Sequence, residues 1–118
     1  MAIKRPLVKI CGLRTAESLA VALEAGADMV GFVFFGPSPR NISLSEAAAL
    51  GRLVQGRAKI VALTVDADDA LIDAISRAVA PDILQLHGKE TPERAAALSA
   101  RTGKQIMKAI GVSESADL

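Results

Sequence analysis

Short apolar runs alternate along the chain with longer segments in which apolar side chains recur every three or four residues. The runs are rich in β-branched and aliphatic residues and cover residues 7–11, 29–35, 59–65, 83–87 and 106–112. They lack a steady alternation of apolar and polar positions, which is typical of strands covered on both faces, as in parallel sheets. Four helices are predicted between them. In the third, one apolar stripe is formed by Leu71, Ile72, Ile75 and Val79.

Residues that begin and end helices stand where this pattern requires them. Ser43 followed by Glu46 predicts a capping box, in which each side chain binds a free backbone N–H. Thr91 and Pro92 fit the N-cap and the first helical position. The predicted helices end at glycines or a proline, in chain order Gly26, Gly56, Pro81 and Gly103. The sequence therefore predicts four βα units followed by a fifth strand.

Repeated βα units imply a parallel sheet with right-handed crossovers, and two α/β architectures fit this chain. A length of 118 residues favours an open, flavodoxin-like sheet with helices on both faces. The other architecture is the (βα)8 TIM barrel, which takes about 200 residues or more. In that case residues 1–118 form a single incomplete barrel domain, with about the first five strands and four helices. Length favours the open sheet, whereas the sequence motifs favour the barrel.

Composition narrows the class of protein. Hydrophobic residues make up 51% of the chain and the net charge is +1, so a packed globular protein is expected, without the basic field that a nucleic acid requires. No run reaches the roughly 18 apolar residues of a membrane span, and one cysteine permits no internal disulfide. We expect a cytoplasmic protein with no nucleic-acid or membrane partner.

Chemically versatile residues follow the predicted strands at their carboxyl ends, which form the working face in both architectures. Cys11 ends the first strand, Arg40 lies in the loop after the second, and His87 ends the fourth. Cys11 is either a small buried hydrophobe or a thiolate acting as base or nucleophile. Lys9, two residues earlier on the same face, is a candidate to stabilise that thiolate.

The other candidates also have two interpretations. Arg40 is either a surface residue or a clamp for a carboxylate or phosphate, which its planar fork of donors matches. Gln85 and His87 share one face of a strand, where they either form structural hydrogen bonds or line a ligand pocket. No metal site is predicted, because helix N-capping accounts for the aspartates that most resemble one, Asp66, Asp68 and Asp69.

Three segments resemble the phosphoribosylanthranilate isomerase family. They are residues 8–15 (VKICGLRT), residues 31–34 (GFVF) running into residues 38–43 (SPRNIS), and residues 84–88 (LQLHG) with Glu90. Their order and spacing match the family along essentially the whole chain. The resemblance implies a TIM barrel, of which this chain is the amino-terminal part.

The resemblance also implies a reaction: the Amadori rearrangement of N-(5'-phosphoribosyl)anthranilate to 1-(2-carboxyphenylamino)-1-deoxyribulose 5-phosphate, a step of tryptophan biosynthesis that needs no cofactor. In the family, the cysteine at the position of Cys11 is the general base that removes the proton from ribose C2'. The arginine matching Arg40 is expected to hold the anthranilate carboxylate, and Gln85 and His87 match a pocket-lining signature.

The chain departs from the family after its fifth strand. The family's general acid is an aspartate at the end of strand six, and its phosphate site lies in the last part of the barrel. Neither has a counterpart here, and Asp117 would fall in the helix before strand six. We therefore expect a fragment that is inactive alone and self-associates through open strand edges.

Two functions of other classes stay open. One is a flavodoxin-like binding or signalling module, although a receiver domain would need acidic residues where this chain has Cys11 and Gly12. The other is a non-catalytic half-barrel that pairs with another chain.

Overall fold

The computed structural model describes residues 7–108, which form five strands and four helices in strict alternation. The strands are β1 (Lys9–Cys11), β2 (Met29–Phe34), β3 (Lys59–Thr64), β4 (Ile83–Leu86) and β5 (Gln105–Lys108). The helices are α1 (Ala16–Glu24), α2 (Leu44–Val54), α3 (Asp69–Ala78) and α4 (Pro92–Thr102). The expected strands are each found, and in β1 to β4 their ends lie within two residues of the prediction. Residues 109–112 of the predicted fifth strand, and Asp117, lie outside the described residues.

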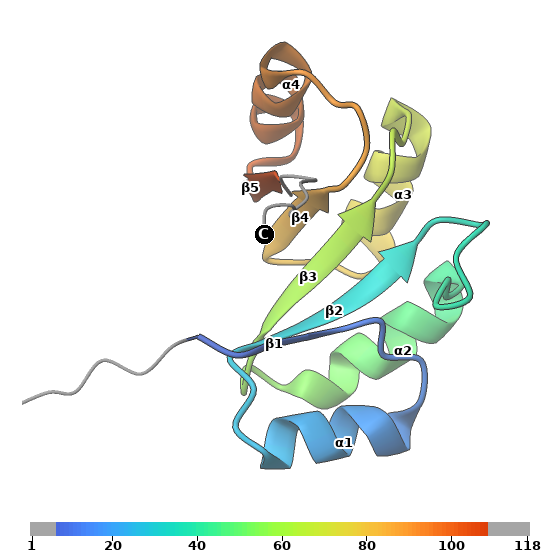
Figure 1. Cartoon of the computed structure of the whole chain (residues 1–118), viewed down its shortest axis with the longest axis vertical. Coiled ribbons are helices and arrows are strands. Elements are labelled where there is room, and N and C mark those ends of the chain that lie inside the picture. Colours follow the sequence, from blue (N-terminus) through green and yellow to red (C-terminus); the bar gives the residue numbers. More distant parts are fainter. Residues whose placement is uncertain (1–6, 109–118) are drawn as a thin grey trace, which may run out of the picture.

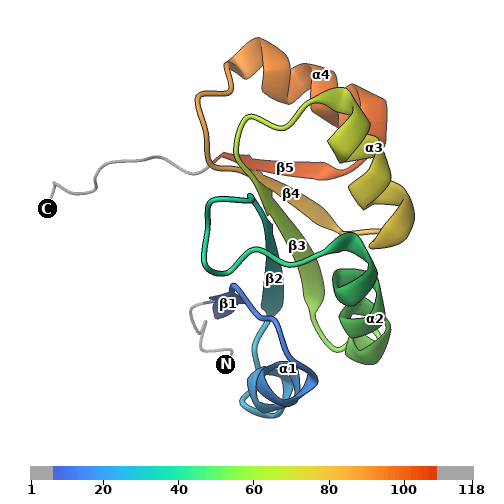
Figure 2. The same ribbon diagram turned by 90° about the vertical axis from the view of Figure 1, so that its right-hand side faces the viewer.

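All neighbouring strands pair in parallel, in the order β1-β2-β3-β4-β5. All four helices lie along one side of the sheet, which curves away from them (Figures 1 and 2). A flavodoxin-like sheet reverses its strand order and carries helices on both faces. The open-sheet alternative, which length favoured, is therefore wrong, and the predicted arc of a (βα)8 barrel is confirmed.

The hydrophobic core lies between the helices and the convex face of the sheet. Every second residue of a strand points to this face, and these residues are buried: Val30, Phe32, Phe34, Ala62, Leu84 and Leu86. The helices bury one stripe each against them, contributing Leu19, Leu23, Ala47, Leu50, Ile72, Ile75 and Leu98. No helix within residues 7–108 is long and apolar enough to cross a membrane.

A hydrogen bond across the concave face shows how strongly the sheet curves. The Lys9 ammonium group of β1 donates to the Gln85 side-chain oxygen of β4, 76 positions further along the chain. In a flat sheet, strands three places apart would be separated by roughly 14 Å, well beyond the reach of one lysine. The two side chains meet because β1 to β4 already form an arc.

The helix ends show which local signals decide the boundaries. Ser43 and Glu46 form the predicted capping box, with the Ser43 Oγ accepting from the Glu46 N–H at 3.1 Å, and Thr91 caps α4 with Pro92 at its first position. At the end of α2 the prediction is off by one residue. Gln55 takes the left-handed conformation, with φ of 52°, and Gly56 follows it with φ of 76°.

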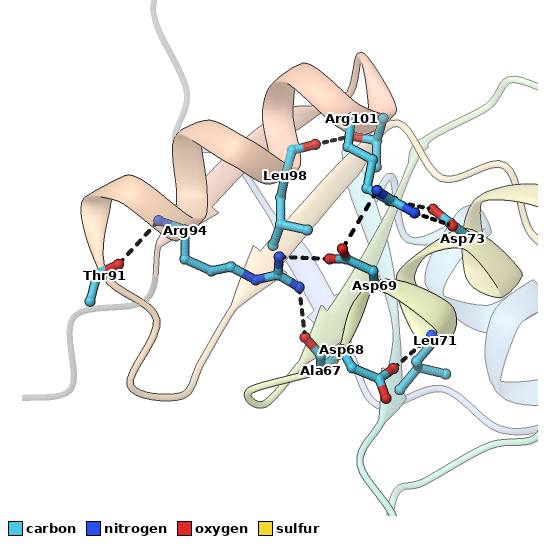
Figure 3. Close-up of polar contacts among 10 residues, drawn as sticks. Ala67, Asp68, Asp69, Leu71, Asp73, Thr91, Arg94, Leu98 and Arg101 are labelled. Atoms are coloured by element: carbon cyan, nitrogen blue, oxygen red, sulfur yellow. Dashed lines mark hydrogen bonds and ion pairs between the residues drawn. The ribbon is translucent and has the colours of Figure 1, made fainter.

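Ion pairs join the outer faces of α3 and α4 (Figure 3). Arg101 binds the Asp73 carboxylate with two donors, at 2.9 and 2.7 Å, and Arg94 contacts Asp69 at 2.7 Å. The hydrogen bond from Arg101 holds the pKa of Asp73 below its ordinary value. These groups are half exposed, so solvent screening limits the stability they contribute.

Candidate active site

One pocket of about 390 Å³ opens at the carboxyl ends of β1 to β4. Three of the residues singled out in the sequence line it together: Cys11, Arg40 and His87. The rest of its wall is mostly apolar and is formed by Val33, Phe35, Ser38, Leu63 and Val65. The structure therefore brings a thiol, a guanidinium group and an imidazole around one opening.

Cys11 is the last residue of β1 and is half-buried at this opening. It pairs with Gly31 of β2, and a Cβ built on Gly31 would lie 3.0 Å from the Cys11 Sγ. The sulfur thus occupies space that any larger residue at position 31 would take. Cys11 is not sealed among aliphatic neighbours, so its sulfur is accessible to a ligand in the pocket.

The side chain of Arg40 is exposed but its stem has a defined place over Gly12. A Cβ on Gly12 would clash with the Arg40 Cδ, and Gly12 also has a φ of +84°, which side chains rarely tolerate. The loop that carries Arg40 is held at several points. The Arg40 backbone N–H donates to the Ser38 Oγ at 3.1 Å, and the Arg14 side chain donates to the Pro39 carbonyl at 2.9 Å.

Gln85 lies in β4 and His87 directly follows it, and the two occupy different places in the site. The exposed His87 side chain lines the pocket, and its backbone N–H donates to the Thr64 carbonyl at 2.9 Å. Gln85 is buried deeper on the concave face and does not line the pocket. Its partner is Lys9, so the hydrogen bond of Lys9 goes to Gln85 and not to the thiol of Cys11.

The three neighbouring aspartates have three separate roles. Asp68 caps α3, accepting from the Leu71 N–H at 2.9 Å. Asp69 pairs with Arg94, and Asp66 accepts from the Lys89 N–H at 2.7 Å. The expectation that helix capping accounts for all three is correct only for Asp68. Within residues 7–108, no cluster of three or more His, Cys, Asp or Glu side chains is placed to hold a metal ion.

A buried carboxylate beside the pocket is the feature that sequence reasoning missed. The Glu90 side chain is 3% exposed and accepts from the backbone N–H groups of Asp66 and Gly88, each at 2.8 Å. The Lys108 Nζ lies 3.3 Å from it. Glu90 stood in the sequence only as part of a family motif, because no spacing rule links a glutamate to the loop two residues before it.

Opposing effects act on the pKa of Glu90. Burial raises the pKa of this carboxyl, but hydrogen bonds from three backbone N–H groups and from Lys108 favour the ionised form. Their sum lowers the pKa of Glu90 below its ordinary value. The side chain is therefore a carboxylate at neutral pH and acts as an acceptor only.

The arrangement has the parts needed to bind and deprotonate an organic anion. A guanidinium group binds a carboxylate with two parallel hydrogen bonds. A thiol in the same pocket can take a proton from carbon once it is ionised. The apolar wall, which includes Phe35, suits an aromatic or aliphatic portion of the ligand.

Comparison with known proteins identifies relatives along nearly the whole chain. The family model of N-(5'-phosphoribosyl)anthranilate (PRA) isomerase matches residues 8–118. An N-(5'-phosphoribosyl)anthranilate isomerase from Bradyrhizobium diazoefficiens is 62% identical over 112 residues, which are 95% of this chain and 50% of the relative. The corresponding protein from Azorhizobium caulinodans is 61% identical over 111 residues, covering 94% of this chain and 49% of its own.

Solved structures agree with the sequence relatives. The crystal structure of phosphoribosyl anthranilate isomerase from Thermotoga maritima superposes with a TM-score of 0.84 at 31% identity, covering 90% of this chain and 51% of that protein. A phosphoribosyl anthranilate isomerase in complex with reduced 1-(o-carboxyphenylamino)-1-deoxyribulose 5-phosphate also gives 0.84 at 31% identity, with coverage of 90% and 54%. The chain thus spans about half the length of the relatives that it matches. With the strand order and the matched residues 8–118, this places the chain in the N-(5'-phosphoribosyl)anthranilate isomerase family.

Proposed function

We propose that this chain supplies the amino-terminal half of the active site of a cytoplasmic enzyme that isomerises N-(5'-phosphoribosyl)anthranilate in tryptophan biosynthesis. In this proposal residues 1–118 belong to one incomplete barrel domain. The observation that carries the proposal is the common pocket of Cys11, Arg40 and His87 at the carboxyl ends of the strands. Its substrate is a small phosphorylated molecule, which fits the ligand of the related solved complex.

The reaction moves protons and requires no oxidant or reductant. Protonation of the ribose ring oxygen breaks its bond to C1' and leaves an iminium ion at C1'. The Cys11 thiolate then removes the proton from C2', and the electron pair forms a C1'=C2' double bond while the nitrogen becomes neutral. Transfer of a proton from the C2' hydroxyl group to C1' gives the ketone and the secondary amine.

Arg40 and the pocket wall orient the substrate for that proton transfer. The guanidinium group of Arg40 binds the anthranilate carboxylate, and the aromatic ring of the substrate lies against the apolar part of the wall. His87 forms part of the rim and is assigned no proton transfer. Gln85 lies deeper on the concave face and acts indirectly, by accepting a hydrogen bond from Lys9.

The proposal leaves two tasks to residues outside the described part of the chain. Within residues 7–108 no aspartate or glutamate lines the pocket to protonate the ribose ring oxygen, and no glycine lines it to form a phosphate-binding loop. Family resemblance assigns both tasks to later strands of the barrel. The proposal is therefore tested in a protein with all eight βα units.

Such a protein can be built as a chimera. This chain is joined to the carboxyl-terminal portion of the Bradyrhizobium diazoefficiens relative that lies beyond the matched 112 residues. We call this protein the completed barrel. It is expected to be folded by circular dichroism and to convert N-(5'-phosphoribosyl)anthranilate in a fluorescence assay. A folded completed barrel without this activity would contradict the proposed function.

Replacement of Cys11 tests the role of the general base. In the completed barrel, Cys11→Ala is expected to lower kcat by about 10²–10⁴-fold with little change in KM, because a general base acts in the transition state. Cys11→Ser is the volume-matched control: it preserves the packing against Gly31 but offers no thiolate, so it should lose a similar factor. Retention of most turnover in either variant would show that Cys11 is not the general base.

A further inference from the structure

Glu90 joins the ends of neighbouring strands at the rim of the pocket. Its two carboxylate oxygens accept from different loops: Oε2 from the Asp66 N–H after β3, and Oε1 from the Gly88 N–H after β4, both at 2.8 Å. Lys108 of β5 reaches the same place, donating to the Gly88 carbonyl at 2.7 Å. One buried carboxylate therefore connects three consecutive strand ends.

The two backbone groups that Glu90 binds come directly after residues of the pocket wall. Val65 precedes Asp66, and His87 precedes Gly88. A peptide unit is planar and rigid, so fixing the N–H of one residue also restricts the residue before it. The hydrogen bonds of Glu90 thereby limit the positions of both Val65 and His87.

The two loops are also packed too closely to move independently. A Cβ on Gly88 would lie 2.6 Å from the Asp66 Oδ1, and the same oxygen accepts from the Lys89 N–H at 2.7 Å. Asp66 itself has a φ of 50°, in the left-handed region that residues other than glycine adopt uncommonly. A change at Glu90 is therefore transmitted to both loops.

We propose that Glu90 is a positioning residue: it sets the place of His87 and Val65 on the pocket wall without touching the substrate. The inference rests on the proposed function, since it assigns a task within that pocket. Lys108 pairs with the charge of Glu90, so repulsion of the anionic substrate by this carboxylate is offset and the contribution of Glu90 is geometric.

The substitution Glu90→Gln in the completed barrel tests this role. A glutamine keeps the size of the side chain but provides one acceptor oxygen for two N–H groups, so one loop loses its anchor. We expect kcat/KM to fall about tenfold, mainly through KM, because the loss of one charge-assisted hydrogen bond loosens the wall but leaves Cys11 in place. Binding of the reduced 1-(o-carboxyphenylamino)-1-deoxyribulose 5-phosphate ligand should weaken by the same factor.

Asp73→Asn is the matched control for lost stability. It removes the charge of a partly exposed carboxylate that also accepts two hydrogen bonds, here from Arg101 between α3 and α4 (Figure 3), away from the pocket. It should lower Tm without changing KM. An unchanged KM in Glu90→Gln would overturn the inference.

A double-mutant cycle separates positioning from general stabilisation. If Glu90 acts through the pocket wall, the effect of Glu90→Gln on KM should shrink to about twofold in a His87→Ala background. An equal penalty in both backgrounds would overturn the inference while leaving the proposed function intact. Should Glu90→Gln fail to fold, Glu90→Asp keeps the carboxylate on a shorter side chain that cannot reach both N–H groups, and it is expected to raise KM in the same direction. No shift with that variant would also overturn the inference.

Discussion

At the scale of single residues, Gly12 links the backbone of the first loop to the placement of Arg40. Its positive φ and the Arg40 stem beside it exclude a side chain for two separate reasons. The first is backbone strain, worth about 1–2 kcal/mol for a residue other than glycine. The second is a direct clash with the residue that is proposed to hold the substrate carboxylate.

These two reasons can be separated by substitution. In the completed barrel, Gly12→Ala is expected to lower the free energy of unfolding by about 1–2 kcal/mol and to raise KM about tenfold, because the displaced Arg40 loses a charge-assisted contact. Gly26→Ala is the matched control, since Gly26 has a φ of +85° and a Cβ added there would meet no atom within 4 Å. It should show the stability loss alone, by denaturation and steady-state kinetics. An equal KM for both variants would show that Arg40 does not hold the substrate carboxylate.

Residue identity and position at the strand ends predicted that Cys11, Arg40 and His87 meet at the pocket, but not that Gln85 lies outside its lining. Cys11 ends β1, Arg40 and His87 follow β2 and β4, and parallel strands end at one rim, so their convergence could be expected. The contacts of Lys9 and Glu90 could not. Both depend on how far the sheet curves and on where two loops approach each other, which no local pattern encodes.

At the scale of elements, the end of α3 contains a strained position. Ala80 has a φ of 50° although it is neither glycine nor asparagine, and it directly precedes Pro81, which further restricts its backbone. The predicted stop at Pro81 is correct, but the strain before it was not visible in the sequence. Helix caps such as Ser43 were predictable because side chain and backbone lie within one turn.

This strain predicts that a glycine will stabilise the protein. Ala80→Gly in the completed barrel is expected to raise the free energy of unfolding by about 0.5–1 kcal/mol, the strain relieved less the entropy lost by glycine. Ala78→Gly, two residues earlier and still in α3, is the control of opposite sign and should cost about 0.5–1 kcal/mol. Urea denaturation measures both. Destabilisation by Ala80→Gly would show that position 80 is not strained.

At the scale of the whole molecule, the concave face and the two outer strands of the arc stand out. β1 and β5 each pair on one side only within residues 7–108. The concave face contains a hollow of about 460 Å³ with mainly apolar walls, among them Leu7, Met29, Ile83 and Met107. Leu7 is 70% exposed there. Apolar surfaces and strand edges of this kind promote association between chains.

We therefore expect the 118-residue chain alone to self-associate and to show no isomerase turnover. Light scattering coupled to size exclusion should give a mass above that of one chain. Leu7→Lys should reduce this mass by placing a charge on the concave face. Val21→Lys is the control, because Val21 is 68% exposed on α1, away from that face. A folded, monomeric chain would contradict the expectation.

The alternation of strands and helices in a parallel sheet followed from the βα rhythm, whereas the strand order and the one-sided placement of the helices did not. Both architectures share the same local pattern. The sequence motifs favoured the barrel, and the strand order, the placement of the helices and the contact between Lys9 and Gln85 decide for it.

The contact between Lys9 and Gln85 has a consequence for folding while the chain is being synthesised. Since the ribosome releases a protein from its amino end, β1 and β4 emerge before any later strand of a barrel. A lysine and a glutamine that already meet across the arc would set its radius at this stage. We expect the growing chain to offer later strands a sheet that is already curved, so that closure of the barrel completes a curvature that is already present.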